Sequence, residues 1–113
     1  MSLPRPLVWS DSTRAKVRAF PELVRAKVGY ELFRIQRGEM PSDWKPMQSV
    51  GPGVIEVRIH ADGEYRLLLL VQLKDAITVL HAFRKRSRRT SGLDLALARK
   101  RLRDLRRFHG NGR

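Results

Sequence analysis

The 113-residue sequence contains no cysteine, which excludes disulfide bonds and thiolate metal sites and leaves the redox compartment open. It also lacks a long apolar run. The longest, Leu67–Val71, is far shorter than the roughly 20 residues that span a bilayer. The first nine residues include Pro4 and Pro6 and have no apolar segment typical of a secretory signal. We therefore expect a cytoplasmic protein.

A pattern for a metal or cofactor site is missing as well. His60, His81 and His109 share no ligand spacing, and no recognisable carboxylate motif accompanies them. Gly51 and Gly53 precede a predicted strand rather than a helix, so this segment does not resemble a phosphate-binding loop. The sequence therefore predicts no metal ion and no cofactor.

Acidic residues are scarce at the C-terminal end of the chain. Residues 84–113 contain 12 Lys and Arg against Asp94 and Asp104, a net charge of +10. Residues 1–83 contain 12 Lys and Arg against 9 Asp and Glu, a net charge of only +3. A local excess of positive charge is typical of proteins that bind a polyanion. RNA, DNA, a ribosome surface or an acidic protein would each fit, and a solvated basic tail without a partner is the alternative.

Three segments have the pattern of consecutive β-strands: residues 54–59, 65–73 and 77–83. Asp62-Gly63 predicts a hairpin turn between the first two, because glycine accepts the positive φ that tight turns require. Lys74-Asp75 would form the second turn. The middle segment is apolar on both faces, as in a central strand. The third segment leads into the basic run Arg84–Arg89, so the sheet would carry five positive charges to one edge.

Three other segments have helical patterns: residues 11–19, residues 21–37, and a C-terminal segment that Thr90 or Ser91 would cap. In the second helix the apolar stripe comprises Val24, Val28, Leu32 and Ile35, widened by Leu23, Tyr30 and Phe33. Gly38 is the expected stop of that helix. In the last helix the stripe comprises Leu95, Ala98, Leu102 and Leu105.

The predicted fold class is therefore α+β, in a single domain of residues 1–113. A small antiparallel sheet would carry an N-terminal helical hairpin packed on it and a basic C-terminal helix. Residues 7–9 would add a short strand at the edge of the sheet, and residues 39–53 would form a connector.

Arginines on the predicted strands are the first candidates for function. Arg58 and Arg66 would lie on neighbouring strands near the first hairpin turn. An arginine at the head of an apolar strand is costly unless it is paired or reaches a ligand. Two interpretations stay open for Arg66: a salt bridge to Glu56 or Glu64, or contact with a phosphate. For Arg84–Arg89 we favour contact with nucleic acid, because the run follows a strand directly and adjoins a basic helix.

A catalytic histidine is the weaker interpretation of His81. It shares its predicted strand face with Ile77, Val79 and Phe83. This pattern favours a buried, hydrogen-bonded core histidine.

The sequence resembles the RelE/HigB superfamily of toxins from type II toxin–antitoxin systems, in particular its phage-derived HigB-like branch. The resemblance covers nearly the whole chain, and five segments carry it: residues 21–22 with 29–30, 45–47, 53–58, 65–67 and 79–87. The most specific are Tyr65-Arg66 on a strand, and His81-Ala82-Phe83 followed by a Lys/Arg run.

The resemblance implies a RelE-like fold and a metal-independent endoribonuclease that cuts mRNA, in many members at the ribosomal A site. In this family the RNA's own 2′-hydroxyl attacks the adjacent phosphate. Arg66 matches the strand arginine that holds the scissile phosphate, Arg58 matches a basic residue on the preceding strand, and Lys85 matches the catalytic part of the basic cluster. The RNA-binding residues implied by position are Arg84, Arg86, Arg88 and Arg89.

The resemblance also implies partners: a helix-turn-helix antitoxin of the HigA-like kind, mRNA and the ribosome. The general base stays open between Glu56, His81 and Lys85. Some family members carry a lysine pair on the first of these strands and a tyrosine near the C-terminus, whereas the tyrosines here are Tyr30 and Tyr65. Two alternatives remain: a non-catalytic, phage-derived RNA- or ribosome-binding protein, and a regulatory protein that docks an acidic partner.

Overall fold

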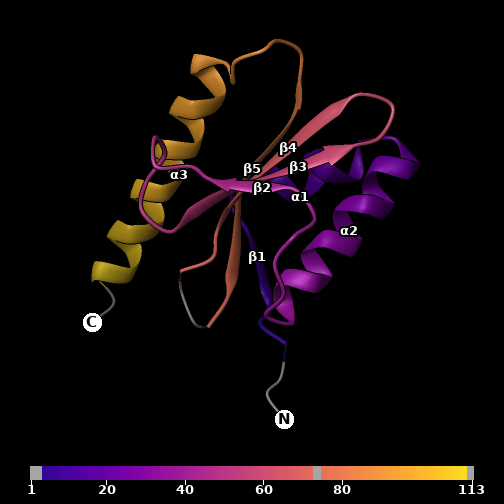
Figure 1. The fold of residues 1–113 in the computed structure, drawn as a ribbon. Coiled ribbons are helices and arrows are strands. Elements are labelled where there is room, and N and C mark those ends of the chain that lie inside the picture. The colour runs from indigo at the N-terminus through magenta and orange to yellow at the C-terminus, as the bar shows by residue number, and fades with distance from the viewer. Residues whose placement is uncertain (1–3, 73–74, 112–113) are drawn as a thin grey trace.

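A computed structural model describes residues 4–72 and 75–111 (Figure 1). Its elements in chain order are β1 (Leu7–Trp9), α1 (Thr13–Arg18), α2 (Glu22–Gln36), β2 (Trp44–Pro46), β3 (Val54–His60), β4 (Glu64–Leu70), β5 (Ile77–Lys85) and α3 (Gly92–Asn111). The strands form one five-stranded sheet in the order β1-β5-β4-β3-β2. The α+β class predicted from the sequence is confirmed. None of the described helices is long and apolar enough to cross a membrane.

The centre of the sheet is built from two antiparallel pairings. In the β3–β4 hairpin, Arg58 stands directly opposite Arg66. The predicted turn is confirmed, because Asp62 and Gly63 both adopt positive φ, at 50° and 127°. The predicted end of the second strand at Leu73 and the turn at Lys74 lie outside the described residues.

β5 contains an irregularity that the alternating pattern did not predict. Leu68 is paired with His81 and Leu69 with Val79, so Leu80 is an extra residue on β5. Such a bulge shifts the side-chain alternation of the strand. The expectation that His81 shares a face with Ile77 and Val79 is therefore wrong, and its ring stacks on Phe83 with centroids 5.2 Å apart.

The edges of the sheet differ from the predicted antiparallel arrangement. β1 pairs with β5 in parallel, with Leu7 opposite Ile77 and Trp9 opposite Val79, so the sheet is mixed. β2 lies within the predicted connector and pairs antiparallel with β3. Three residues ending in proline give too short an alternation to reveal a strand, although an edge strand tolerates proline.

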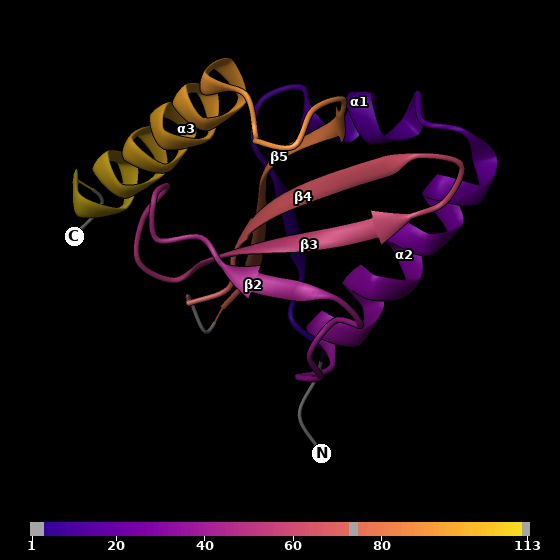
Figure 2. The same cartoon turned by 45° about the horizontal axis from the view of Figure 1, so that its top comes forward.

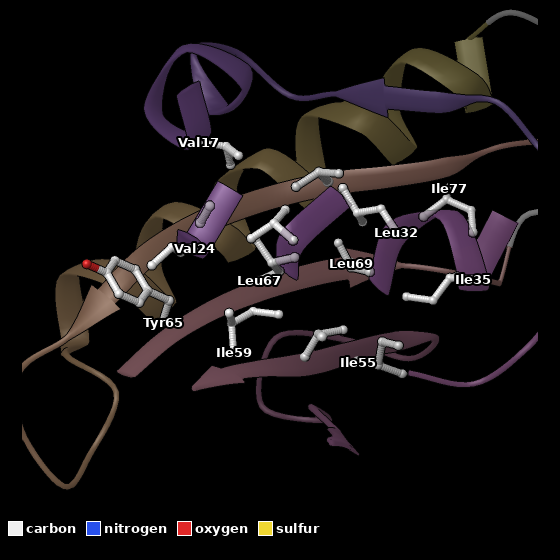
Figure 3. Close-up of a cluster of buried hydrophobic side chains, with 14 of the residues drawn as sticks. Val17, Val24, Leu32, Ile35, Ile55, Ile59, Tyr65, Leu67, Leu69 and Ile77 are labelled. Carbon is white, nitrogen blue, oxygen red and sulfur yellow. The ribbon is translucent and has the colours of Figure 1, made fainter. Parts of the chain in front are cut away.

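One face of the sheet is covered by α1 and α2, and its core is drawn in Figure 3. The α2 stripe of Val24, Val28, Leu32 and Ile35 is buried there, as predicted. The widening by Leu23, Tyr30 and Phe33 is wrong, since all three side chains are exposed. Gly38 does end the helix: it has φ 88°, and the amide of Glu39 donates to the carbonyl of Arg34 (3.0 Å).

The opposite face packs against α3, which lies on the other side of the sheet from α2 (Figures 1 and 2). Ala98 and Leu102 are buried in this second core, and Leu95 and Leu105 are partly buried against it, as the predicted stripe requires. Of the two residues that could cap the helix, Ser91 has this role: its hydroxyl accepts from the amide of Asp94 (3.1 Å). The loop before β3 approaches α3 so closely that a side chain at Gly51 would collide with Leu102.

Candidate nucleic-acid interface

The predicted strand cations lie together on the face of the sheet opposite α1 and α2. Arg58, Arg66 and Glu56 alternate along β3 and β4 with core residues of the other face. Arg58 Nε donates to Glu56 Oε1 at 3.2 Å, and Arg66 Nε lies 3.9 Å from the same oxygen. Two cations therefore share one carboxylate that is only 1% exposed.

Arg66 has further partners and is itself only 6% exposed. Its Nη1 donates to Glu64 Oε1 (3.0 Å) and to the carbonyl of Tyr65 (2.9 Å). Both salt-bridge partners considered for Arg66 are thus present. Arg66 Nε and Glu56 Oε2 are buried without a hydrogen-bond partner. The charged groups of Arg66 and Glu56 are therefore only partly hydrogen-bonded by the rest of the protein.

His60 links this network to the β2 side of the sheet. Its Nδ1 is 2.8 Å from Glu64 and its Nε2 is 2.6 Å from Asp43, which also lies 3.9 Å from Arg58. These hydrogen bonds, to Glu64 first and then to Asp43, raise the pKa of His60 above its ordinary value. The imidazolium with two N–H donors matches two carboxylates. Charges of alternating sign therefore connect the series Asp43, His60, Glu64, Arg66, Glu56 and Arg58.

His81 is buried, 2% exposed, with both ring nitrogens occupied. Arg101 Nη1 donates to its Nδ1 at 3.1 Å, which leaves the proton on Nε2, and Nε2 donates to Asp94 Oδ1 at 2.7 Å. Burial lowers the pKa of His81, against the opposing effect of Asp94. A neutral imidazole whose acceptor nitrogen already receives an arginine proton has no lone pair for a substrate. The geometry thus favours a structural role, the interpretation preferred from the sequence.

Asp94 is the outer end of this arrangement. Ser91 Oγ donates to its Oδ2 at 2.6 Å. Partial burial works to raise the pKa of Asp94, but the hydrogen bonds from Ser91 and His81 outweigh it, and the pKa lies below its ordinary value. Asp94 is held as a carboxylate at the surface end of the network.

The basic run lies at the end of β5 and in the segment that leads to α3. Arg84, Arg86, Arg88 and Arg89 are exposed, and Lys85 is half-buried. A pocket of about 590 Å³ opens beside them. Its lining residues are Lys16, Ala19, Phe20, Pro21, Tyr65, Phe83, Arg84, Lys85, Arg86, Ser87, Arg89, Ser91 and Asp94. The cavity that these residues line is called the β5-edge pocket below.

The predicted site residues therefore fall into two groups. Arg58, Arg66 and Glu56 meet on the strand face, whereas four members of the basic run meet at the β5-edge pocket and Arg88 does not line it. Lys85 belongs to the pocket but stands opposite Glu64, the partner of Arg66, in the β4–β5 register. Lys85 is thus the predicted residue that adjoins both groups.

Sequence reasoning missed Lys16, Asp94 and Arg101. Lys16 reaches the pocket only because α1 lies against β5, where Thr13 Oγ1 donates to the carbonyl of Leu80 (3.4 Å). No local signal marks this contact. The spacing of Ser91 and Asp94 matches the start of a capping motif, which could have identified Asp94 as a first-turn residue but not as a partner of His81.

Several cations of the basic helix are bound to the protein itself. Arg99 donates to the carbonyl of Ser49 (2.6 Å), Arg106 to that of Pro52 (2.9 Å), and Arg101 to that of Leu80 (2.9 Å). Part of the C-terminal positive charge therefore fixes α3 to the sheet and its loops. Within residues 4–72 and 75–111, no group of three or more His, Asp or Glu is placed to hold a metal ion.

A family model described as phage-derived protein Gp49-like (DUF891) matches residues 15–103, which is most of the chain. The search of curated proteins gives no significant match.

Proposed function

We propose that this chain, which belongs to the family of phage-derived Gp49-like proteins, is the toxin of a toxin–antitoxin pair and cuts mRNA. The resemblance to RelE/HigB toxins supports the same function. The single observation that carries the proposal is the gathering of exposed cations around a pocket at the end of β5.

The proposed reaction is metal-independent transesterification. The 2′-hydroxyl loses its proton and attacks the adjacent phosphorus, and the bond to the 5′-oxygen of the next nucleotide breaks. The leaving 5′-oxygen takes up a proton, so the products are a 2′,3′-cyclic phosphate and a 5′-hydroxyl. Cationic side chains stabilise the negative charge that builds on the phosphorane oxygens. DNA cannot react in this way because deoxyribose lacks the attacking group.

Residue roles follow from how far solvent reaches each side chain. Among the three candidates for the general base, Glu56 and His81 are buried and hydrogen-bonded, and Lys85 is the one that solvent reaches. We assign to Lys85 contact with the reacting phosphate. Because it is the accessible candidate for the general base, we also assign to it removal of the proton from the 2′-hydroxyl. Arg58 and Arg66 would contribute positive potential from the strand face. If Arg66 contacts the phosphate directly, its ion pair with Glu64 would have to break.

The partners of the proposed toxin follow from its resemblance to RelE/HigB toxins. Its substrate would be mRNA on the ribosome in the cytoplasm, and a helix-turn-helix antitoxin of the HigA-like kind would neutralise it.

A second function is favoured by one specific observation. Arg58 and Arg66 are paired with Glu56 and Glu64 rather than left open to a ligand. This arrangement would suit a non-catalytic RNA- or ribosome-binding protein, which needs the basic run but no reactive group.

Expression of the protein alone, without the proposed antitoxin, separates these functions. We expect the wild-type protein to arrest growth of a bacterial host and to create new mRNA 3′ ends, and Lys85→Gln to lose both effects. Lys100→Gln is the matched control, because Lys100 is an exposed cation on α3 paired with Asp104. Arrest without new RNA ends would support the non-catalytic function, and growth without arrest would contradict the toxin proposal.

A further inference from the structure

The β5-edge pocket exists because β1 is short. β1 pairs with β5 only as far as Val79, so no strand continues along this edge of β5. α1 lies there instead, and the carbonyl of Leu80 accepts from Thr13 and Arg101. Figure 2 shows the end of β5 and the segment leading to α3 near α1. The space between them forms the pocket.

The charge of the pocket fits an anion. Five cations line it from three segments: Lys16 from α1, Arg84 and Lys85 from β5, and Arg86 and Arg89 from the segment before α3. Asp94 is the one acid among the described lining residues. Its two oxygens receive hydrogen bonds from His81 and Ser91, so the carboxylate is already engaged on its inner side.

The pocket also offers planar groups. Phe20 is partly buried, and its ring lies 4.9 Å from that of Tyr65 at an angle of 57°. The guanidinium of Arg84 lies over the Tyr65 ring, 5.8 Å from its centroid, and presents a second planar surface. Unpaired RNA bases stack on aromatic rings and on arginine planes.

The size of the pocket restricts the ligand further. Its volume of about 590 Å³ lies within the range of about 300–1,000 Å³ for pockets that hold small molecules. A space of this size can take one base with its phosphate, whereas a duplex keeps its bases stacked inside the helix and cannot present one.

We propose that the β5-edge pocket binds one unpaired nucleotide of a single-stranded RNA, with the base against Phe20 and Arg84 and the phosphate on Lys16 and Arg86. This inference rests on the proposed function only in taking RNA as the ligand, and it does not require cleavage. It adds Lys16 and Phe20 to the RNA-contacting residues. It also predicts that single-stranded RNA is preferred over a duplex of the same length.

Direct binding of mononucleotides tests the pocket. In ¹⁵N-labelled protein titrated with 5′-AMP, we expect amide shifts at Lys16, Phe20 and residues 84–89. Inorganic phosphate should bind more weakly at the same place, because it lacks the stacking surface. Phe20→Leu should weaken 5′-AMP binding by at least about fivefold, since stacking of one base is worth about 1–3 kcal/mol. It should leave phosphate binding unchanged.

Salt dependence of RNA binding tests the role of Lys16. Each phosphate contact with single-stranded RNA contributes about −0.7 to the log–log slope of affinity against salt. Lys16→Gln should therefore reduce the slope by about 0.7. Arg14→Gln is the matched control: it removes an exposed cation from the same helix that does not line the pocket, and we expect no change in slope.

Three results would overturn the inference: 5′-AMP shifts confined to other surfaces, equal effects of Lys16→Gln and Arg14→Gln, or equal affinity for single-stranded and duplex RNA. These outcomes are independent of the toxin proposal. Nucleotide binding in the pocket without growth arrest would contradict the proposed function alone. Growth arrest without nucleotide binding in the pocket would contradict only this inference.

Discussion

Glu56 and Arg66 are buried charged side chains of opposite sign that lie close together on the sheet. Removing one partner of a buried ion pair leaves the other charge uncompensated, which costs more than the pair contributes. Both arginines lie beside Glu56 Oε1, so Arg58 would remain as its hydrogen-bond partner if Arg66 were removed, and Oε2 has no partner in either case. Arg66 therefore has a structural role as the second cation beside this carboxylate, whether or not it also acts in catalysis.

Arg66→Ala should lower the free energy of unfolding by about 3 kcal/mol, because it removes one of the two cations beside the buried Glu56 carboxylate. Combining it with Glu56→Gln should recover much of this loss, since the remaining group is then neutral. Urea denaturation of the two single variants and the double variant measures the coupling. A folded Arg66→Ala protein within about 0.5 kcal/mol of wild type would contradict the structural role. If that protein also lost growth arrest, the loss would be a catalytic effect.

His60 and His81 should affect stability in opposite directions as pH changes. Hydrogen bonds to Glu64 and Asp43 raise the pKa of His60, so its contribution is present below the unfolded value of about 6.5 and is lost as pH rises through the folded value. Burial chiefly lowers the pKa of His81, with Lys16 and Arg101 nearby adding to the effect. Below about pH 6.5 the unfolded chain therefore binds a proton at His81 that the folded chain does not bind. The stability of the fold decreases as the pH is lowered through this range.

His60→Gln should remove the contribution of His60 to the pH dependence of stability and leave that of His81. We expect the variant to lose stability between about pH 7 and about pH 5 more steeply than wild type. The change will be modest because His60 is exposed and its ion pairs are screened by solvent. Denaturation midpoints across this range measure it, and parallel pH profiles for variant and wild type would contradict these assignments.

At the scale of elements, the start of α3 connects the fold to the proposed site. Ser91 caps the helix and donates to Asp94, which accepts from His81 on β5. One hydroxyl thus orients both the first turn of α3 and the acid that lines the β5-edge pocket.

Ser91→Ala should cost about 1 kcal/mol of stability through loss of the cap. Thr90→Ala is the matched control and should have almost no effect, because Ser91 rather than Thr90 makes the capping hydrogen bond. Thermal unfolding followed by circular dichroism compares the two. Equal losses in both variants, or a larger loss for Thr90→Ala, would contradict the assignment of the cap.

The elements also show which parts of the structure could be predicted from the sequence. The stripes of α2 and α3 and the Asp62-Gly63 turn are local patterns, and all were confirmed. The partners of Arg66 were predictable because the turn fixes the β3–β4 register. The parallel β1–β5 pairing, the bulge at Leu80 and the approach of Lys16 depend on contacts between distant segments, which leave no local pattern.

For the whole molecule, the net charge of +13 is less informative than where the cations can reach. Arg99, Arg101 and Arg106 bind backbone carbonyls, and Arg58 and Arg66 bind carboxylates. The β5-edge pocket brings five cations together around one recess. We therefore propose that RNA binds at the end of β5, between α1 and the start of α3, and that the protein cuts it there through the substrate's own 2′-hydroxyl.

The most direct test uses two RNAs that differ in one atom. Both are single-stranded and carry a mapped cleavage site, and one has a 2′-deoxy sugar immediately 5′ to the scissile phosphate. Each is incubated with the purified protein, as free RNA in excess EDTA and as ribosome-bound RNA in the Mg²⁺ buffer that ribosomes require. We predict that the all-ribose RNA is cut, leaving a 2′,3′-cyclic phosphate or 3′-phosphate on the upstream fragment. The deoxy RNA should bind equally well and stay intact. Cleavage of the deoxy RNA at the mapped site, or loss of free-RNA cleavage on chelation, would contradict this mechanism.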